Sequence, residues 1–303
     1  MSEPYFVIGK GWIKLIEYDW KYLIIVDAGR YDIFKKLYKK YFRGRLYKAI
    51  SPATSTMEWL VKVFRGYYDV VYVSANPYVN SRQEMKDPRG LRYKASEHFA
   101  KIVDVWDKGW NKELDTVHPS MVNVHVLAAL TKYKSKRMII HYIQPHHPYI
   151  GGKYKKYQIF IRLLLNSQEK LQSYEMKRRN KHKYQGLEEI QAILRDKIGQ
   201  FIIDYFGIGV YWDIRKLIYK DYTYQPALIY YHEGWEGLKK AYEENYELAL
   251  KYISRILPFL KGKILITADH GEYLGEYGLY GHGNLPRHKP IIEVPWLEIV
   301  KQR

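Results

Sequence analysis

The chain contains no cysteine, no long apolar run and comparatively few acidic side chains. The lack of cysteine excludes disulfide bonds, thiolate metal sites, cysteine nucleophiles and iron–sulfur clusters. The most apolar stretches, residues 138–143 and 264–268, are far too short to cross a bilayer, which takes about 20 residues of helix. Residues 1–4 do not resemble a signal peptide, because they form neither a basic nor an apolar segment. From these absences we expect a soluble, cytoplasmic protein.

Basic side chains are abundant: 50 Lys and Arg stand against 32 Asp and Glu, which gives a formal net charge of +18. This charge favours an anionic partner, such as nucleic acid, a phosphorylated substrate or a membrane surface. A basic surface can also serve solubility alone. Apolar residues make up 47% of the 303 residues, which is enough for a packed core and argues against global disorder.

Short apolar runs alternate with segments of helical spacing. The runs typical of strands are residues 23–26, 46–50, 70–74, 138–143 and 264–267. Apolar residues recur near every 3.6 positions in 33–41, 57–64 and 238–260, and Gly262 is a natural end for the last of these helices. The alternation predicts an α/β fold with a doubly wound, mostly parallel sheet flanked by helices.

Residues 151–225 differ from this pattern. They open with Gly151 and Gly152, include the basic stretch 177–183, and contain helix-like segments without a clear strand. We expect one domain over residues 1–303, in which 151–225 form a largely helical inserted lid or subdomain.

Asp27 and the pair Asp269–His270 each follow an apolar run that predicts a buried parallel strand. Open α/β sheets place their ligands at the carboxyl ends of such strands. Two carboxylates and an imidazole at one sheet edge would suit a divalent metal ion. A buried Asp–His hydrogen bond is also a common structural arrangement, so neither motif establishes a metal site alone.

Thr56 ends the hydroxyl-rich stretch 51–56, which leads from a predicted strand into a predicted helix. Free N–H groups at a helix N-terminus favour an anion. A hydroxyl there can coordinate a metal and attack phosphorus or sulfur. The alternative is simple helix capping by Thr54, Ser55 or Thr56, with Glu58 in the first turn.

Three histidines lie in predicted loops. His146 and His147 occupy a turn bounded by prolines after the run 138–143, and His282 lies in the glycine-rich loop 280–284. Loop histidines at a sheet edge can bind metal or donate to anionic oxygens. One such histidine is unremarkable, but we expect these loops to meet at the same edge.

In chain order, these motifs resemble the alkaline phosphatase/sulfatase superfamily, and most closely its sulfatase-like branch. The most specific part is residues 267–283, Thr-Ala-Asp-His-Gly-Glu-Tyr-Leu-Gly-Glu-Tyr-Gly-Leu-Tyr-Gly-His-Gly, followed by Val294 and Pro295. Asp27, the hydroxyl-bearing helix start and residues 145–149 fall where this branch has its matching motifs. The resemblance covers roughly residues 1–150 and 235–300 and implies an alkaline-phosphatase-like fold.

The resemblance also implies a role for each motif. It assigns Asp27, Asp269 and His270 to a metal ion and makes Thr56 both the nucleophile and a further ligand of that ion. His146 matches a histidine that contacts the anionic group of the substrate, and His147 is the alternative residue for that role. His282 falls where many sulfatases have a lysine directed at the leaving-group oxygen.

Departures from the family pattern narrow the chemistry. Sulfatases convert a Cys or Ser in a Cys/Ser-x-Pro-x-Arg pattern into formylglycine, whereas Ser51 is followed directly by Pro52 and no Arg follows. Ala28 stands where calcium-binding sulfatases have a second acidic residue, which favours Zn²⁺ or Mn²⁺ over Ca²⁺. One ion is expected, and His146 and His282 leave a second one open.

These observations lead to the hypothesis of a metal-dependent hydrolase or transferase of phosphate esters with a phosphothreonine intermediate. We expect an anionic phosphoryl substrate, such as a phosphodiester or a phosphorylated glycan or lipid head group. One alternative is a sulfatase-like sulfoesterase. Another is a non-catalytic scaffold that binds nucleic acid or another polyanion through interleaved basic and Tyr residues in 153–157 and 177–184.

Overall fold

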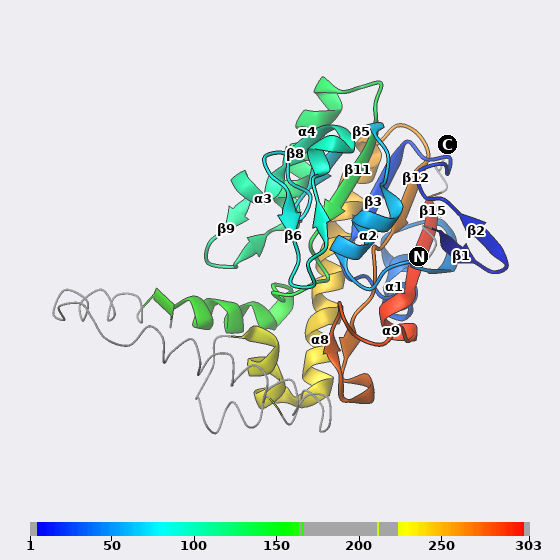
Figure 1. The fold of residues 1–303 in the computed structure, drawn as a ribbon. Helices are drawn as coiled ribbons and strands as arrows, with labels where there is room; N and C mark the ends of the chain where they lie inside the picture. Colours follow the sequence, from blue (N-terminus) through cyan, green and yellow to red (C-terminus); the bar gives the residue numbers. More distant parts are fainter. Residues whose placement is uncertain (1–4, 164, 167–210, 212–223, 300–303) are drawn as a thin grey trace.

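The computed structural model describes residues 5–163, 165, 166, 211 and 224–299. A nine-stranded sheet forms its centre (Figure 1). In spatial order its strands are β2 (Gly11–Ile13), β1 (Phe6–Ile8), β4 (Gly44–Ile50), β15 (Glu293–Ile299), β12 (Ile264–Thr267), β3 (Tyr22–Val26), β11 (Arg137–Tyr142), β5 (Tyr68–Ser74) and β8 (Phe99–Asp104).

Five consecutive strands, from β12 to β8, are parallel, and β15, β4, β1 and β2 extend the sheet by antiparallel pairing. Every residue of β3 is buried, as expected for a parallel strand covered on both faces. The predicted α/β class and doubly wound, mostly parallel sheet are confirmed.

Helices cover both faces of the sheet. Adjacent strand residues point to opposite faces, and in β11 the His141 ring contacts Trp59 while the Tyr142 hydroxyl donates to Asn123. Trp59 belongs to α2 (Thr56–Val63) and Asn123 to α4 (Pro119–Lys132), so these two helices lie on opposite sides. The long helix α8 (Gln225–Ile256) packs against α4 and against α1 (Tyr31–Leu37) (Figure 1).

The predicted elements occur with shifted ends. The long helix begins at Gln225 rather than 238 and contains a kink at Gly234, where φ is 65°. The central strand β15 was not predicted, because Pro295 lacks an amide hydrogen and argues against a central strand. The carbonyl oxygen of Pro295 nevertheless accepts a hydrogen bond of 2.7 Å from the Thr267 hydroxyl of β12.

Most of the expected insertion 151–225 lies outside the described residues, so its role as a helical lid stays a prediction. Its described beginning contains the 3₁₀ turn Gly152–Tyr154 and helical residues 155–163. Among the helices that the structure describes, none combines the length and the apolar character needed to cross a membrane.

Candidate active site

Two neighbouring parallel strands deliver the central carboxylates. Asp27 directly follows β3 and Asp269 lies two residues beyond the end of β12, so both reach the same edge of the sheet. The backbone N–H of Ala28 donates to Asp269 Oδ1 at 3.1 Å. Helix α8 holds this loop, because the Tyr242 hydroxyl donates to Ala28 O at 2.6 Å and accepts from Arg30 N at 2.9 Å.

Thr56 is the first residue of α2, and the helix cap is its neighbour Ser55, whose hydroxyl accepts from Glu58 N. The Thr56 hydroxyl is therefore not used for capping. It donates to Asp269 Oδ2 at 2.7 Å and lies 3.5 Å from His270 Nε2. Only 4% of Thr56 is exposed, yet it lines the cavity at this edge.

His270 completes the convergence of the predicted ligands. Its Nε2 lies 3.7 Å from Asp27 Oδ1 and 3.4 Å from Asp269 Oδ2, and all three side chains are buried. Burial and the nearby charge of Asp27 raise the pKa of Asp269 to about 6. Burial also disfavours ionisation of Asp27, but its pKa is lowered overall by His141, His146 and His270.

The donor set fits a divalent cation. Two buried carboxylates close together are costly unless a positive charge compensates them. Asp27 Oδ1 is buried and has no hydrogen-bond partner among the described residues, which leaves an oxygen available to bind an ion. Burial lowers the pKa of His270 and so favours the neutral imidazole, the state in which histidine binds metal. Carboxylate oxygens with imidazole nitrogen suit Zn²⁺ or Mn²⁺.

Sequence reasoning missed two side chains that contact this group. Asn76 follows β5, and its Nδ2 donates to Asp27 Oδ2 at 2.5 Å and to Thr56 Oγ1 at 3.3 Å. His141 in β11 places Nε2 3.6 Å from Asp27 Oδ2, while its Nδ1 pairs with the Tyr72 hydroxyl at 2.9 Å. The available signal was their position at the ends of β11, which pairs with β3, and of β5, the next strand in the sheet.

His141 also has ligand atoms within 4.8 Å of those of Asp27 and Asp269. Its Nε2 is buried and has no hydrogen-bond partner in the part of the chain that the structure describes. His141 therefore either orients Asp27 or contributes to the same metal group as His270.

The three loop histidines gather beside the central group. The His282 ring lies 4.4 Å from that of His270 and 4.9 Å from that of His146, and His146 stacks on His147 at 4.3 Å. Glu272, fully buried, accepts from His282 Nδ1 at 3.2 Å.

His146, His147 and Glu272 form a second group whose possible ligand atoms lie within 4.8 Å of one another. Burial lowers the pKa of His147 well below its ordinary value, and the neighbouring His146 and His282 add to this. A histidine with a lowered pKa and a buried carboxylate are suitable ligands for the second metal ion that the sequence analysis kept as an alternative.

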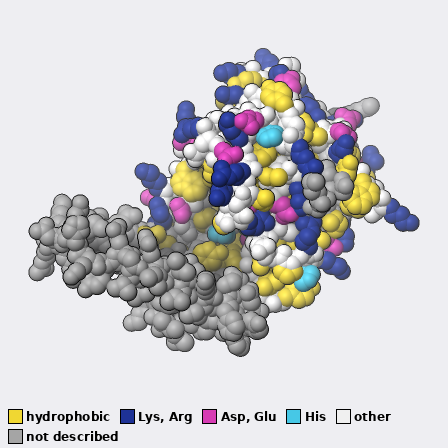
Figure 2. All heavy atoms as spheres, in the orientation of Figure 1, with side chains coloured by type: hydrophobic (Ala, Val, Ile, Leu, Met, Phe, Trp, Pro, Cys, Tyr) yellow, Lys and Arg dark blue, Asp and Glu magenta, His cyan; other side chains and the backbone are white. Residues whose placement is uncertain are grey.

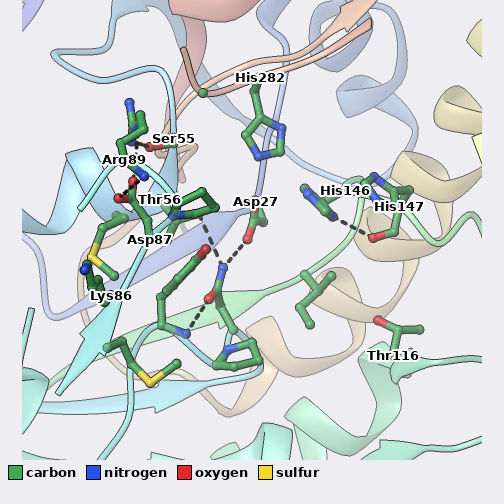
Figure 3. Close-up of a pocket in the computed structure, with 18 of the residues that line it drawn as sticks. Asp27, Ser55, Thr56, Lys86, Asp87, Arg89, Thr116, His146, His147 and His282 are labelled. Carbon is green, nitrogen blue, oxygen red and sulfur yellow. Dashed lines mark hydrogen bonds and ion pairs between the residues drawn. The ribbon is translucent and has the colours of Figure 1, made fainter. Parts of the chain in front are cut away.

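A cavity of about 760 Å³ opens over these residues. Figure 3 shows Asp27 near its middle, His146 and His147 on one side, and Ser55, Thr56 and Arg89 on the other. Tyr78, Met85, Trp110 and Ile143 add apolar and aromatic lining. The cavity is therefore much larger than one phosphoryl group and can enclose a sizeable organic substituent.

Gly271 allows the loop after His270 to pass close to α9 (Lys289–Ile292). Its N–H donates to Ile291 O at 2.7 Å, and a Cβ at this position would meet Pro290 O at 2.1 Å. We predict that Gly271→Ala lowers the free energy of unfolding by about 1–3 kcal/mol, because the backbone must shift. Denaturant unfolding measures this.

Gly66→Ala is the matched control for this substitution, since its Cβ would meet only ordinary contacts of 3.5 Å or more with Tyr68. We expect it to leave stability unchanged or to raise it by up to about 1 kcal/mol. Equal effects of the two substitutions would contradict the close approach at Gly271.

The proposed nucleic-acid surface receives little support from the described part of 153–157. Tyr154 is fully buried and Tyr157 is 9% exposed, while Lys153 pairs with Glu233 at 2.7 Å. The rings of Tyr154 and Tyr157 are therefore not exposed for stacking with bases. Residues 177–184 lie outside the described residues. On the face shown in Figure 2, Lys and Arg side chains are scattered rather than gathered in one patch.

No family model matches the sequence, and no curated protein matches it. The chain is similar in structure to an integral membrane protein, lipooligosaccharide phosphoethanolamine transferase A from Neisseria meningitidis, with 12% identity and a TM-score of 0.45. This match covers 96% of the chain, which spans only about half (49%) of the length of that protein.

Two periplasmic domains are also similar. The C-terminal periplasmic domain of phosphoethanolamine transferase EptC from Campylobacter jejuni matches at 14% identity and a TM-score of 0.43, over 94% of this chain and 81% of that one. The corresponding Escherichia coli domain, solved in complex with Zn, matches at 12% identity and a TM-score of 0.37, over 97% and 75%.

These matches overturn the expected cytoplasmic location, because the similar structures are described as an integral membrane protein and as periplasmic domains. That expectation depended on the lack of an apolar segment, which does not specify a compartment. In fold, the chain is similar to these solved structures.

Proposed function

We propose that this protein is a metal-dependent phosphoesterase or phosphotransferase with Thr56 as its nucleophile. The observation that carries the proposal is the position of the Thr56 hydroxyl. It lies at the start of α2, faces the cavity, donates to Asp269 at 2.7 Å and lies 3.5 Å from His270. A capping threonine would instead direct its hydroxyl to the helix backbone.

Asp27, Asp269 and His270 would hold the metal ion, with Thr56 beside them. A divalent cation bound there supplies charge neutralisation at the phosphoryl oxygens and makes a nearby hydroxyl more acidic. Asn76 links Asp27 to Thr56 by its Nδ2 contacts and so fixes the nucleophile relative to the carboxylates. The residues are thus positioned before substrate binds.

Thr56 Oγ1 attacks phosphorus in line with the leaving oxygen. A Thr56–phosphorus bond forms, the bond from phosphorus to the leaving oxygen breaks, and the hydroxyl proton follows the existing hydrogen bond to Asp269. Water, or an acceptor alcohol in a transferase, then attacks the phosphothreonine. Its oxygen bonds to phosphorus and loses its proton to the histidine that protonated the leaving oxygen, while the Thr56–phosphorus bond breaks and Asp269 returns the proton to Thr56.

His146 and His282 contact the reacting group in this proposal. Both line the cavity, and the Glu272 contact at Nδ1 orients the His282 ring. From these positions they donate to phosphoryl oxygens or give a proton to the leaving oxygen. His147, stacked on His146, would substitute for it or orient it.

A phosphorylated glycan or lipid head group is the proposed class of substrate. The cavity of about 760 Å³ and its apolar lining support a substituent larger than phosphate itself. The similar solved structures are described as phosphoethanolamine transferases, so a phosphoethanolamine ester belongs among the test substrates.

A panel of chromogenic phosphate monoesters, phosphate diesters, a phosphoethanolamine ester and sulfate esters tests this function. We expect turnover of phosphate esters that Zn²⁺ or Mn²⁺ stimulates and a chelator removes, with sulfate esters slower. Added acceptor alcohols distinguish transfer from hydrolysis. Absence of turnover on every ester with either metal would contradict the enzyme and favour a binding scaffold. Faster sulfate-ester turnover would favour the sulfoesterase.

A further inference from the structure

A short hairpin closes the side of the cavity next to Thr56. Strands β6 (Met85–Lys86) and β7 (Arg92–Tyr93) pair antiparallel, and the turn between them lines the cavity. Asp87 is 5% exposed, and its Oδ1 accepts from the N–H groups of Arg89 at 3.0 Å and Leu91 at 2.9 Å. These hydrogen bonds fix the conformation of the turn.

The same turn holds the Arg89 guanidinium beside the nucleophile. Arg89 Nε donates to Asp87 Oδ2 at 2.8 Å, and Nη2 donates to the hydroxyl of Ser55. Ser55 directly precedes Thr56, and consecutive Cα atoms are about 3.8 Å apart. Figure 3 shows Arg89 next to Ser55 and Thr56, across the cavity from His146 and His147.

Part of this guanidinium is left for a ligand. Nη1 makes no hydrogen bond to any residue that the structure describes and lies 3.9 Å from a carboxylate oxygen of Glu58. Lys86 is exposed and has no ion pair within the described ranges. In the ion-pair group around Arg89, Glu58 lies within 4.0 Å of Lys62, Arg89 and Arg287, and Asp87 pairs with Arg89, so three cationic side chains surround two carboxylates.

The phosphoryl group under attack has other partners. Asn76, His146 and His282 surround the carboxylate group from other directions, and a metal ion there would bind the same phosphoryl oxygens. Arg89 instead contacts Ser55, the residue before Thr56 in the chain. An arginine fork binds carboxylate or phosphate by two parallel hydrogen bonds.

We propose that Arg89, assisted by Lys86, forms a subsite for a second anionic group of the substrate, a carboxylate or phosphate attached close to the phosphoryl group that Thr56 attacks. The identity of the attacked group rests on the proposed function, whereas the subsite itself rests on the hairpin. Substrates with two neighbouring anionic groups are therefore selected over those with one.

Binding of two matched ligands tests the subsite, with Thr56→Ala as the protein throughout so that neither phosphate ester is turned over. 2-Phosphoglycolate carries a carboxylate where 2-hydroxyethyl phosphate carries a hydroxymethyl group. By calorimetry on the metal-loaded protein, we expect phosphoglycolate to bind at least about tenfold more tightly, as charge-assisted hydrogen bonds imply. Ethylene glycol bisphosphate shows whether phosphate serves better than carboxylate as the second group.

Arg89→Met keeps the side-chain stem and removes the charge. We expect it to reduce the preference for phosphoglycolate to less than about threefold while 2-hydroxyethyl phosphate binds as before. Lys86→Met, which leaves all hydrogen bonds of the turn in place, should reduce the preference less. If Arg89→Met disturbs the turn, Lys86→Met alone still tests the charge of the subsite.

An unchanged preference in both variants would overturn the proposal. Equal weakening of both ligands by Arg89→Met would do so too, since it would place Arg89 on the attacked phosphoryl group. Failure of the proposed function gives a different result: no ester is turned over, yet the preference and its dependence on Arg89 persist.

Discussion

Thr56→Ala is expected to reduce kcat on the best phosphate ester by at least about a thousandfold, because removing a nucleophile removes the covalent step. The hydroxyl that donates to Asp269 at 2.7 Å has no equivalent in alanine. Steady-state kinetics measures the loss, and mass spectrometry of quenched wild-type enzyme should detect phosphate on the peptide that contains Thr56.

Thr56→Ser is the matched control, since it keeps the hydroxyl at the first position of α2. It should retain most of the activity and the phosphoenzyme. Full turnover by Thr56→Ala would move the nucleophile to Thr54 or Ser55. The structure disfavours both, because Thr54 Oγ1 donates to Gly283 O at 2.6 Å and Ser55 caps α2.

Asp269→Asn is expected to have two effects of opposite sign. It removes a metal ligand, so affinity for Zn²⁺ or Mn²⁺ should fall by at least about a hundredfold, since loss of even an outer-shell partner costs 10–100-fold. In metal-free protein it removes the repulsion from Asp27 that, with burial, raises the pKa of Asp269 to about 6. Ionisation of Asp269 therefore lowers the free energy of unfolding of the metal-free wild type above that pH.

Denaturant unfolding at pH 8 with and without metal separates the two effects. Metal-free Asp269→Asn should be more stable than the metal-free wild type, because the neutral amide does not repel Asp27. Metal at a hundred times its Kd should stabilise the wild type by about 2.7 kcal/mol and the variant hardly at all. Asp69 forms an exposed ion pair with Lys136. Asp69→Asn should therefore change neither the metal-free stability nor the stabilisation by metal by more than about 1 kcal/mol.

Equal stabilisation of wild type and Asp269→Asn by metal would show that the ion binds elsewhere. The group formed by His146, His147 and Glu272 would then be the first alternative site. Loss of stability in the metal-free variant would contradict the repulsion between Asp27 and Asp269.

The sequence predicted the central strands well because their signal is local. Residues 23–26, 70–74 and 264–267 are continuous apolar runs, and each is a buried strand in the sheet. The polar residue at the end of two of these runs, Asp27 or Asp269, is equally visible in one dimension. Strand β15 and helix α4 were missed, because Pro295 and the mixed surface of 119–132 blur the local pattern.

What the sequence determined by itself was therefore the α/β class and the identity of the side chains at the strand ends, since both depend on local patterns of apolar and polar residues. Only the tertiary structure decided which partners these side chains meet: Asn76 on Asp27, Glu272 on His282 and Arg89 on Ser55. Those contacts join residues 10 to 49 positions apart. No local pattern encodes such pairs, because they arise only when strands and loops from separate parts of the chain meet at one edge of the sheet.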